Sequence, residues 1–410
     1  MATFRGREVL RAKYDSPIAK KLRRRHPYQV ARKEACQVYD KIFGLIYGHC
    51  VGDAVGLLTE NMSKEQAKKT YGSVASKLEL VHKKLIDDAH RRKWKVNDWT
   101  EESDHMIILI QSLVQNCGDI VPDDIAKRLM DWSEHGFLEL GDDIGYGLCH
   151  VNKNVINHPQ FSEEPLKAAE IIWRKSEHTC VTNSALTRCC VMGIHHYNAL
   201  GKVIKYTMET CSITHAHPKC IASCVAVTTT IAVLLQNDEK YQTKKGELDI
   251  DSIIENSYQY ASRCMTNCSY QEIKELRQYM KATSLKELKL TEAGLANHTY
   301  KAMGAGFWAL KQRNFRQAIT DIVMEGGDAD ANACVAGAML GCKLGVKENP
   351  QSWITALEHR LWLDQIIDRF QWFQSLSSND INDKSLNATQ KSLVQKSIVY
   401  ERKKALRAHL

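Results

Sequence analysis

Hydrophobic positions along the chain recur mostly with the spacing of an α-helix. Apolar residues three and four positions apart line one face of a helix, whereas a half-buried strand alternates every second residue. Strand-like alternation between turn residues is scarce. The pattern predicts helices with wide apolar faces over five segments: 106–115, 166–174, 219–235, 301–311 and 332–346. No repeat and no convincing linker interrupts 41–372, so we expect one large all-α domain over residues 36–410.

Two of the predicted helices carry small residues at every fourth position. These residues are Gly44, Gly48, Gly52 and Gly56 in the first helix, and Ala333, Gly337, Gly341 and Gly345 in the second. A glycine inside a helix costs about 1 kcal/mol relative to alanine. A row of missing side chains, however, lets another helix approach closely. We expect both helices in the middle of the bundle, either against each other or each against a different neighbour.

Charge is concentrated in a basic N-terminal arm, residues 1–35. The arm contains eleven lysines and arginines against three acids, an excess equal to the net charge of +8 of the whole chain. The rest is neutral on balance, so we expect no nucleic-acid-binding domain, although the run 20–25 could contact phosphates or act as a nuclear address. Near the other end, the polar residues 375–388 predict an exposed loop before a basic C-terminal helix.

Composition and the absence of targeting signals indicate the cellular compartment. Hydrophobic residues make up 44% and charged residues 25% of the chain, which is typical of a soluble globular protein. No uncharged apolar run approaches the length of a membrane-spanning helix, and the N-terminus lacks the apolar core of a signal peptide, so we expect no membrane association. The 14 cysteines lie mostly among apolar residues without paired C-x-x-C motifs, which favours free thiols. We therefore expect a cytoplasmic protein, or a nuclear one if the arm is an address.

Acidic residues gather beside the glycine helices and before the apolar helix at 106–115. They are Asp53, Glu60, Glu101, Glu102, Asp104, Asp328 and Asp330. One such cluster is most simply explained by capping, because acids favour helix N-termini. If several clusters converge, two like charges 4 Å apart repel by about 4 kcal/mol at an effective dielectric of about 20, so the site must take up protons or cations. Oxygen ligands alone favour Mg²⁺, Mn²⁺ or Ca²⁺.

Six segments in order resemble the motifs of the ADP-ribosylglycohydrolase family. They are 52–56 with Glu60, 99–103, 143–147, 183–188 with Gly193, 214–218, and 326–331, and they span about residues 41–365. The resemblance implies an all-α, orthogonal helical bundle with a central metal cleft. It also implies two bound Mg²⁺ ions, or Mn²⁺ in their place.

The resemblance also implies roles for single residues. The metal ligands would be Thr100, Glu101, Glu102, Asp328 and Asp330, with Glu60, Glu101 and Glu102 as the catalytic carboxylates and Glu60 at the mouth of the cleft. The substrate-binding residues would be Asp143, Gly145, Tyr146, Gly147, Asn183, Ser184, Ala185 and His215. The implied reaction is metal-assisted hydrolysis at the anomeric carbon of ADP-ribose, releasing a protein side chain or a small leaving group. The implied partner is ADP-ribose or an ADP-ribosylated protein.

Several positions depart from the family pattern. Glu101 and Glu102 stand in place of aspartates, and Ala331 in place of a threonine ligand. Thr187 and Ser184 replace methionine and glycine. An added methylene moves a carboxylate by roughly 1.5 Å, and Mg²⁺ demands near-octahedral geometry. Three functions therefore stay open. The first is an active ADP-ribosyl hydrolase, and the second is a non-catalytic ADP-ribose-binding or structural, crystallin-like member of the same fold. The third is a hydrolase that acts on a different glycoside or on a free metabolite.

Overall fold

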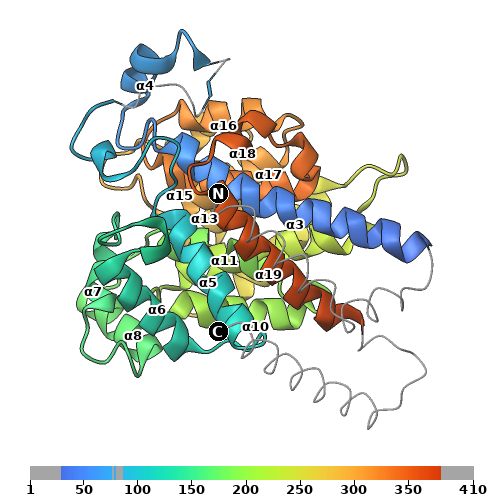
Figure 1. The fold of residues 1–410 in the computed structure, drawn as a ribbon. Coiled ribbons are helices and arrows are strands. Elements are labelled where there is room, and N and C mark those ends of the chain that lie inside the picture. The colour runs from blue at the N-terminus through green and yellow to red at the C-terminus, as the bar shows by residue number, and fades with distance from the viewer. Residues whose placement is uncertain (1–28, 76–77, 80–85, 380–410) are drawn as a thin grey trace, which may run out of the picture.

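The computed structural model describes residues 29–75, 78–79 and 86–379 (Figure 1). Within these ranges the regular structure is helical, and the only strand-like pairings are two isolated β-bridges. The all-α prediction is therefore confirmed. The α-helices are α3 (Gln29–Gly56), α4 (Lys64–Tyr71), α5 (Glu101–Gln115), α6 (Pro122–His135), α7 (His150–Ile156), α8 (Pro165–Lys175), α9 (Ser184–Cys189), α10 (Leu200–Ser212), α11 (Pro218–Gln236), α12 (Ile250–Arg263), α13 (Tyr270–Lys281), α14 (Leu285–Leu288), α15 (Thr299–Leu310), α16 (Phe315–Val323), α17 (Ala329–Leu344), α18 (Gln351–Ala356) and α19 (Arg360–Asn379). The short 3₁₀ helices are η2 (Arg91–Lys93), η3 (Leu138–Leu140), η4 (Cys190–Gly193), η5 (Glu239–Tyr241) and η6 (Val346–Glu348).

The five segments singled out by periodicity correspond to α5, α8, α11, α15 and α17. The helix boundaries differ from the predicted ones by a few residues. α5 begins at Glu101, before its apolar run, because the Thr100 side chain caps it. α17 ends at Leu344 rather than at residue 346, since Gly345 has a φ of +88°, which a helix does not allow.

The two glycine helices, α3 and α17, lie directly against each other in the middle of the bundle (Figure 1). A Cβ atom added at Gly48 would lie 2.3 Å from the carbonyl oxygen of Gly337, and one added at Gly337 would lie 2.0 Å from that of Gly48. Gly44 and Gly341 repeat this arrangement one turn away, at 2.2 and 2.0 Å. Only glycine permits such an approach of two backbones. Of the two packings that the sequence left open, the structure therefore contains the direct contact.

α11 is the apolar helix that passes through the core. It packs against α10, α12 and α15. By length and composition it could cross a membrane, but 83% of its most apolar stretch is buried inside the protein. Threonine hydroxyls on this helix bond to carbonyl groups one turn earlier, as Thr229 does to Val225 at 2.6 Å, so they need no water. The burial explains its composition as that of a core helix.

α3 extends across the predicted boundary between arm and domain, and α19 extends into the predicted loop. α3 begins at Gln29, so residues 29–35 of the predicted arm are helical. α19 continues to Asn379, so the loop predicted over 375–388 begins later than expected, because serine costs a helix only a few tenths of a kcal/mol relative to the best residues. The basic run 20–25, the remainder of the loop and the basic C-terminal helix lie outside the described residues. The cysteines whose side chains the structure describes are free thiols, as expected.

Candidate functional site

Asp53 joins the end of α3 to the beginning of α5. Its Oδ1 atom accepts hydrogen bonds from the backbone N–H of Thr100 at 3.0 Å and from the Thr100 hydroxyl at 2.8 Å. Its Oδ2 atom accepts from the N–H of Ser103 at 2.9 Å and from the Ser103 hydroxyl at 2.6 Å. Burial raises the pKa of Asp53 to about 6 in spite of these four donors. Asp53 thus fixes the turn that carries Thr100, Glu101 and Glu102.

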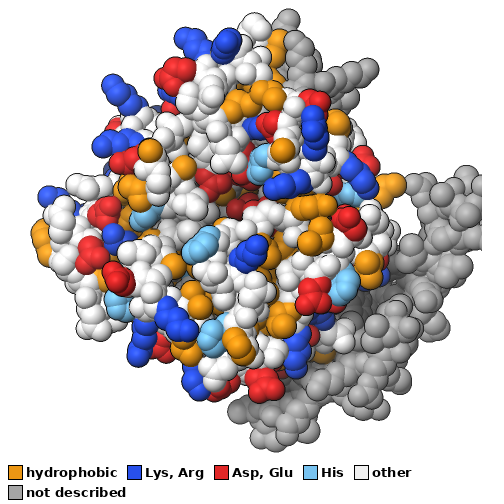
Figure 2. Space-filling model, turned by 90° about the vertical axis from the view of Figure 1, so that its left-hand side faces the viewer, with side chains coloured by type: hydrophobic (Ala, Val, Ile, Leu, Met, Phe, Trp, Pro, Cys, Tyr) orange, Lys and Arg blue, Asp and Glu red, His pale blue; other side chains and the backbone are white. Residues whose placement is uncertain are grey.

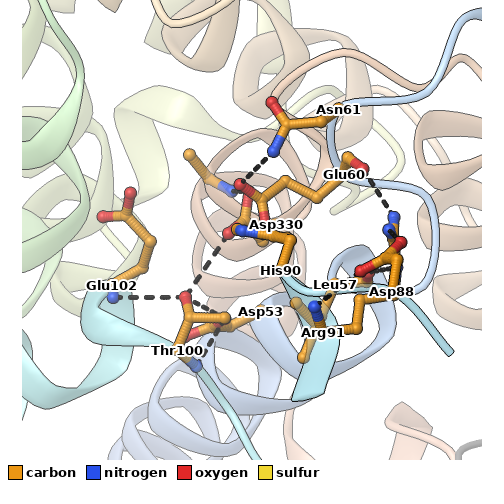
Figure 3. Close-up of polar contacts among 11 residues, drawn as sticks. Asp53, Leu57, Glu60, Asn61, Asp88, His90, Arg91, Thr100, Glu102 and Asp330 are labelled. Carbon is orange, nitrogen blue, oxygen red and sulfur yellow. Dashed lines mark hydrogen bonds and ion pairs between the residues drawn. The ribbon is translucent and has the colours of Figure 1, made fainter. Parts of the chain in front are cut away.

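Three carboxylates meet where α3 ends and α17 begins. One oxygen each of Glu60, Asp328 and Asp330 lies within 4.8 Å of the others. The helix contact produces this meeting, because a Cβ atom at Gly56 would lie 2.2 Å from the Cα atom of Asp330. Thr100 adds an oxygen, since its hydroxyl lies 3.4 Å from Asp330 Oδ2 (Figure 3). We call Glu60, Asp328 and Asp330 the acidic triad.

A tight turn holds the triad between the two helices. Gly326 and Gly327 both have positive φ, and a Cβ atom on Gly326 would lie 2.3 Å from the carbonyl oxygen of Met62. Backbone hydrogen bonds pair this turn with the one after α3: the N–H of Asn61 donates to Gly327 at 2.7 Å, and the N–H of Gly327 donates to Met62 at 2.8 Å. The two glycines thus let the Asp328 turn lie flat against the Glu60 turn.

Glu101 and Glu102 approach the triad from α5 without belonging to it. Glu102 is buried, and its Oε2 atom accepts a hydrogen bond from the Thr187 hydroxyl. Glu101 faces the loop before α7, where a Cβ atom on Gly147 would lie 1.7 Å from Glu101 Oε2. The longer side chains thus already have contacts outside the triad.

The electrostatics show that these carboxylates nevertheless share one neighbourhood. Burial raises the pKa of Asp330 well above its usual range, and the charges of Glu60, Asp328, Glu102 and Glu101 raise it further. Burial and the charge of Glu102 likewise raise the pKa of Glu101. Burial and the charge of Asp328 raise the pKa of Glu102, and burial and the charge of Glu60 raise the pKa of Asp328. The site therefore binds protons or cations more readily than separate carboxylates would.

The glycine-containing loop 143–147 packs against this group. A Cβ atom on Gly145 would lie 2.4 Å from the carbonyl oxygen of Trp132 on α6. Gly147, with φ of +94°, lies against Glu101 as described above. At the exposed surface of the loop, the Tyr146 hydroxyl donates to Asp143 Oδ1 at 3.3 Å. The loop thus brings Gly147 next to Glu101, whereas Gly145 lies against α6 and Asp143 and Tyr146 contact each other at the surface.

The segment that opens α9 reaches the triad from the other side. The Asn183 side-chain amide donates to Asp328 Oδ2 at 2.8 Å. The Ser184 hydroxyl donates to the thiol of Cys149, 3.2 Å away, at the start of α7. Ala185 is buried. The structure therefore brings Asn183 to the carboxylates and Ser184 to the start of α7, which follows the glycine-containing loop.

All of these segments lie close together although they come from both ends of the chain. Figure 2 shows acidic side chains gathered in a hollow near the centre of one face. The family model for ADP-ribosylglycohydrolase matches residues 35–380. The chain belongs to the ADP-ribosylglycohydrolase family.

Other comparisons agree with this family assignment. An uncharacterized protein of Archaeoglobus fulgidus is 24% identical over 332 residues, which cover 80% of this chain and 94% of that protein. The ADP-ribosyl-[dinitrogen reductase] glycohydrolase of Rhodospirillum rubrum is 20% identical over 324 residues, 79% of this chain and 92% of the relative. A solved structure described as an ADP-ribosylglycohydrolase-related protein complex matches with a TM-score of 0.59 at 17% identity, covering 82% of this chain and 99% of that one. The predicted family fold is therefore confirmed.

In this family member, His215 is engaged by the protein itself. Its Nδ1 atom lies 2.8 Å from the hydroxyl of Thr214, and its Nε2 atom lies 2.7 Å from that of Thr182. Burial lowers the pKa of His215 to about 3, and the charge of Arg188 adds to this effect. A neutral ring with two occupied nitrogens could reach a ligand only by giving up Thr182 or by acting through it.

Two further residues of the candidate site escaped the sequence analysis. His90 Nε2 lies 2.5 Å from Oε2 of Glu60, a member of the triad. The buried Arg91 donates from Nε to the carbonyl oxygen of Leu57 at 2.9 Å and from Nη2 to that of Glu60 at 2.5 Å. His90 immediately precedes η2 and Arg91 is its first residue, in a polar segment without helical periodicity. A charged pair three residues apart, Asp88 and Arg91, was the one local signal.

Proposed function

We propose that this chain is a metal-dependent ADP-ribosyl hydrolase. It would cleave the glycosidic bond at the anomeric carbon of ADP-ribose and release a protein side chain or a small leaving group. The observation that carries the proposal is the acidic triad: three carboxylates within 4.8 Å of one another beside a glycine-containing loop, in a chain of the ADP-ribosylglycohydrolase family.

The donors fit a hard divalent cation. The triad offers carboxylate oxygens alone, and the Thr100 hydroxyl adds a neutral oxygen. Mg²⁺ and Mn²⁺ prefer such ligands. The raised pKa values of Asp328 and Asp330 also fit, because a cation would offset the repulsion that raises them. We propose that Thr100, Asp328 and Asp330 hold the metal, with Glu101 and Glu102 as further ligands.

The chemistry that two Mg²⁺ ions, or Mn²⁺, would supply here is Lewis-acid activation of water. The residues of the chain would orient the ligands, move a proton and stabilise the developing charge. Asn183 holds one oxygen of Asp328 and so fixes its orientation. Glu60 would move a proton at the mouth of the cleft, with His90 bonded to its outer oxygen. The negative charge of the carboxylates would stabilise the positive charge that develops at the anomeric carbon.

A non-catalytic ADP-ribose-binding protein is the second candidate. Two observations favour it: Glu102 is bonded to Thr187, and Glu101 faces Gly147, so neither longer side chain joins the triad. In addition, Asp330 Oδ1 accepts a hydrogen bond from the N–H of Ala331 at 2.9 Å. Binding of ADP-ribose without turnover would then be the expected behaviour.

The test compares the wild-type protein with the double variant Asp328→Asn/Asp330→Asn. We expect the wild type to bind Mg²⁺ or Mn²⁺ and to release ADP-ribose from a panel of ADP-ribosylated proteins that differ in linkage. The variant should lose metal binding by calorimetry and lose turnover by at least a hundredfold. Asp321→Asn/Glu325→Gln removes two acids outside the triad and serves as the matched control. Equal turnover by both double variants would contradict the proposed metal role.

A further inference from the structure

A pocket of about 180 Å³ lies beside the candidate site. Asp143 and Tyr146 of the glycine-containing loop line it, and so does Trp99, which immediately precedes Thr100. Its aromatic wall also leads back to the triad. The ring of Tyr146 lies 6.5 Å from that of Trp94, and the ring of Trp94 lies 5.1 Å from that of His90, the partner of Glu60. The pocket therefore adjoins the place where the reacting bond would lie.

The floor of the pocket is acidic. Its four acidic lining residues are Asp98, Asp104, Asp142 and Asp143. The half-buried Asp104 accepts hydrogen bonds from the indole N–H groups of Trp99 and Trp132, at 2.7 and 3.1 Å. Asp98 Oδ2 lies 3.3 Å from Nε2 of the nearly buried His359. This nitrogen makes no hydrogen bond within the described residues.

Neither lysine of the pocket forms an ion pair with these four acids within the described residues. Lys93 Nζ lies 5.8 Å from the centre of the Trp94 ring, and Lys95 Nζ donates to the carbonyl oxygen of Leu140 at 3.3 Å. ADP-ribose is itself anionic through its diphosphate. The carboxylates of this floor that are ionised would repel that diphosphate and attract a cationic group. The pocket therefore suits a lysine or arginine side chain rather than the nucleotide.

Exposed hydrophobic side chains lie on the segments that line the pocket, and one of them, Ile144, is part of the lining itself. Eight large hydrophobic side chains are exposed in the described part of the chain, and four of them lie on the segments that line this pocket. They are Val96, Leu138, Ile144 and Leu361, with exposed fractions of 49%, 71%, 43% and 69%. The segments are joined: the N–H of Glu358 donates to the carbonyl oxygen of Asn97, and the rings of Phe137 and Trp362 lie 4.9 Å apart. Exposed apolar side chains on segments that contact one another are typical of a protein-binding surface.

We propose that the pocket and these four side chains, together the docking face, bind the polypeptide of an ADP-ribosylated protein. A lysine or arginine near the modified residue enters the acidic pocket, and apolar side chains around it contact the rim. This inference rests on the proposed function, because it assumes that ADP-ribose occupies the neighbouring cleft. It makes a modified protein, rather than free ADP-ribose or a small conjugate, the preferred ligand.

The test compares the affinities of three ligands by calorimetry and fluorescence anisotropy. They are ADP-ribose, an ADP-ribosylated peptide with lysines beside the modified residue, and the same peptide with glutamates there. We expect the lysine peptide to bind the wild type at least tenfold more tightly than the other two. In Leu138→Lys/Leu361→Lys, that advantage should disappear while the affinity for ADP-ribose stays within twofold. Tyr270→Lys changes an exposed aromatic residue on α13, outside the pocket lining, and should retain the advantage.

The outcomes separate the docking face from the proposed function. Wild type that binds ADP-ribose but binds the three ligands equally would overturn the docking face alone. An unchanged preference in the double lysine variant would also overturn it. Wild type that neither binds nor hydrolyses any ADP-ribose ligand would overturn the proposed function, and the docking face with it. Because affinity is measured, the test applies equally to a protein that binds without turnover.

Discussion

Single residues determine how closely the glycine-containing loop approaches the carboxylates. Gly147 has no side chain, and Glu101 occupies the space where one would lie. The family resemblance implies an aspartate at position 101, and the longer glutamate uses the space that Gly147 leaves open. The added methylene of Glu101 is therefore accommodated by this contact.

Replacing Gly147 with alanine tests that contact. The new Cβ atom would lie 1.7 Å from Glu101 Oε2, at a backbone φ of +94° that costs a side chain about 1–2 kcal/mol. We expect Gly147→Ala to weaken ADP-ribose binding, and any turnover, by at least tenfold, measured by calorimetry and steady-state kinetics. Gly246→Ala is the control, since Gly246 has a similar φ of +77° but nothing within 4 Å. If both variants bind ADP-ribose as the wild type does, the loop does not contribute to the site.

Sequence reasoning at this scale found the acids but not their partners. Asp53 was visible as one acid among several, yet its four hydrogen bonds to Thr100 and Ser103 make it the residue that fixes the start of α5. His90 carried no signal at all, because its contact with Glu60 joins residues 30 apart through a segment without periodicity. Side-chain partners depend on tertiary packing, which local patterns do not contain.

At the scale of elements, the contact of α3 with α17 positions the triad. The spacing of small residues predicted close approach but not the partner, since a glycine ridge fits any helix. The structure shows which helix it is: the carbonyl oxygens of Gly44 and Gly48 lie 2.0 Å from where Cβ atoms of Gly341 and Gly337 would be. Short elements such as α4 were not predicted. Its Ser63 and Gln66 form a capping box, but the helix is too polar for its hydrophobic periodicity to be evident.

A methyl group added to one glycine of the α3–α17 contact should force the two helices apart. In Gly337→Ala the Cβ atom would lie 2.0 Å from the carbonyl oxygen of Gly48, so one backbone must move. Overpacking of this kind costs about 1–3 kcal/mol, and we expect urea unfolding to report a loss of that size. Gly201→Ala, at a helical position with nothing within 4 Å, should cause no loss and could gain up to about 1 kcal/mol. Equal stability of the two variants would contradict the close contact.

At the scale of the whole molecule, the site draws on segments that the chain separates widely. Asp330 meets Thr100 across 230 positions, and Asn183 meets Asp328 across 145. Local periodicity predicts neither contact, and the ordered family motifs supplied what periodicity could not. The cost of this assembly is that several carboxylates are buried together. Burial is the largest cause of the raised pKa values of Asp53, Glu101, Glu102, Asp328 and Asp330.

Metal-free stability should therefore fall as these groups ionise. A carboxyl whose pKa is higher in the folded than in the unfolded protein binds more protons when folded, so stability decreases as pH rises. The decrease begins near the ordinary pKa values of 3.8 and 4.5 and, for Asp53, continues to about pH 6. Asp328→Asn/Asp330→Asn removes two of the charges. In EDTA, we expect its Tm to rise relative to wild type by several degrees between pH 4.5 and 7.

Divalent cation should reverse this comparison. Bound Mg²⁺ or Mn²⁺ would replace the protons and stabilise the folded wild type by mass action, whereas the double variant would gain little. The relevant quantity is the difference in Tm between the two proteins, because their surface carboxylates titrate alike and cancel. With excess cation at pH 7, wild type should therefore be the more stable of the two. A difference that does not change with pH or with cation would mean that Asp328 and Asp330 neither share charge with their neighbours nor bind metal.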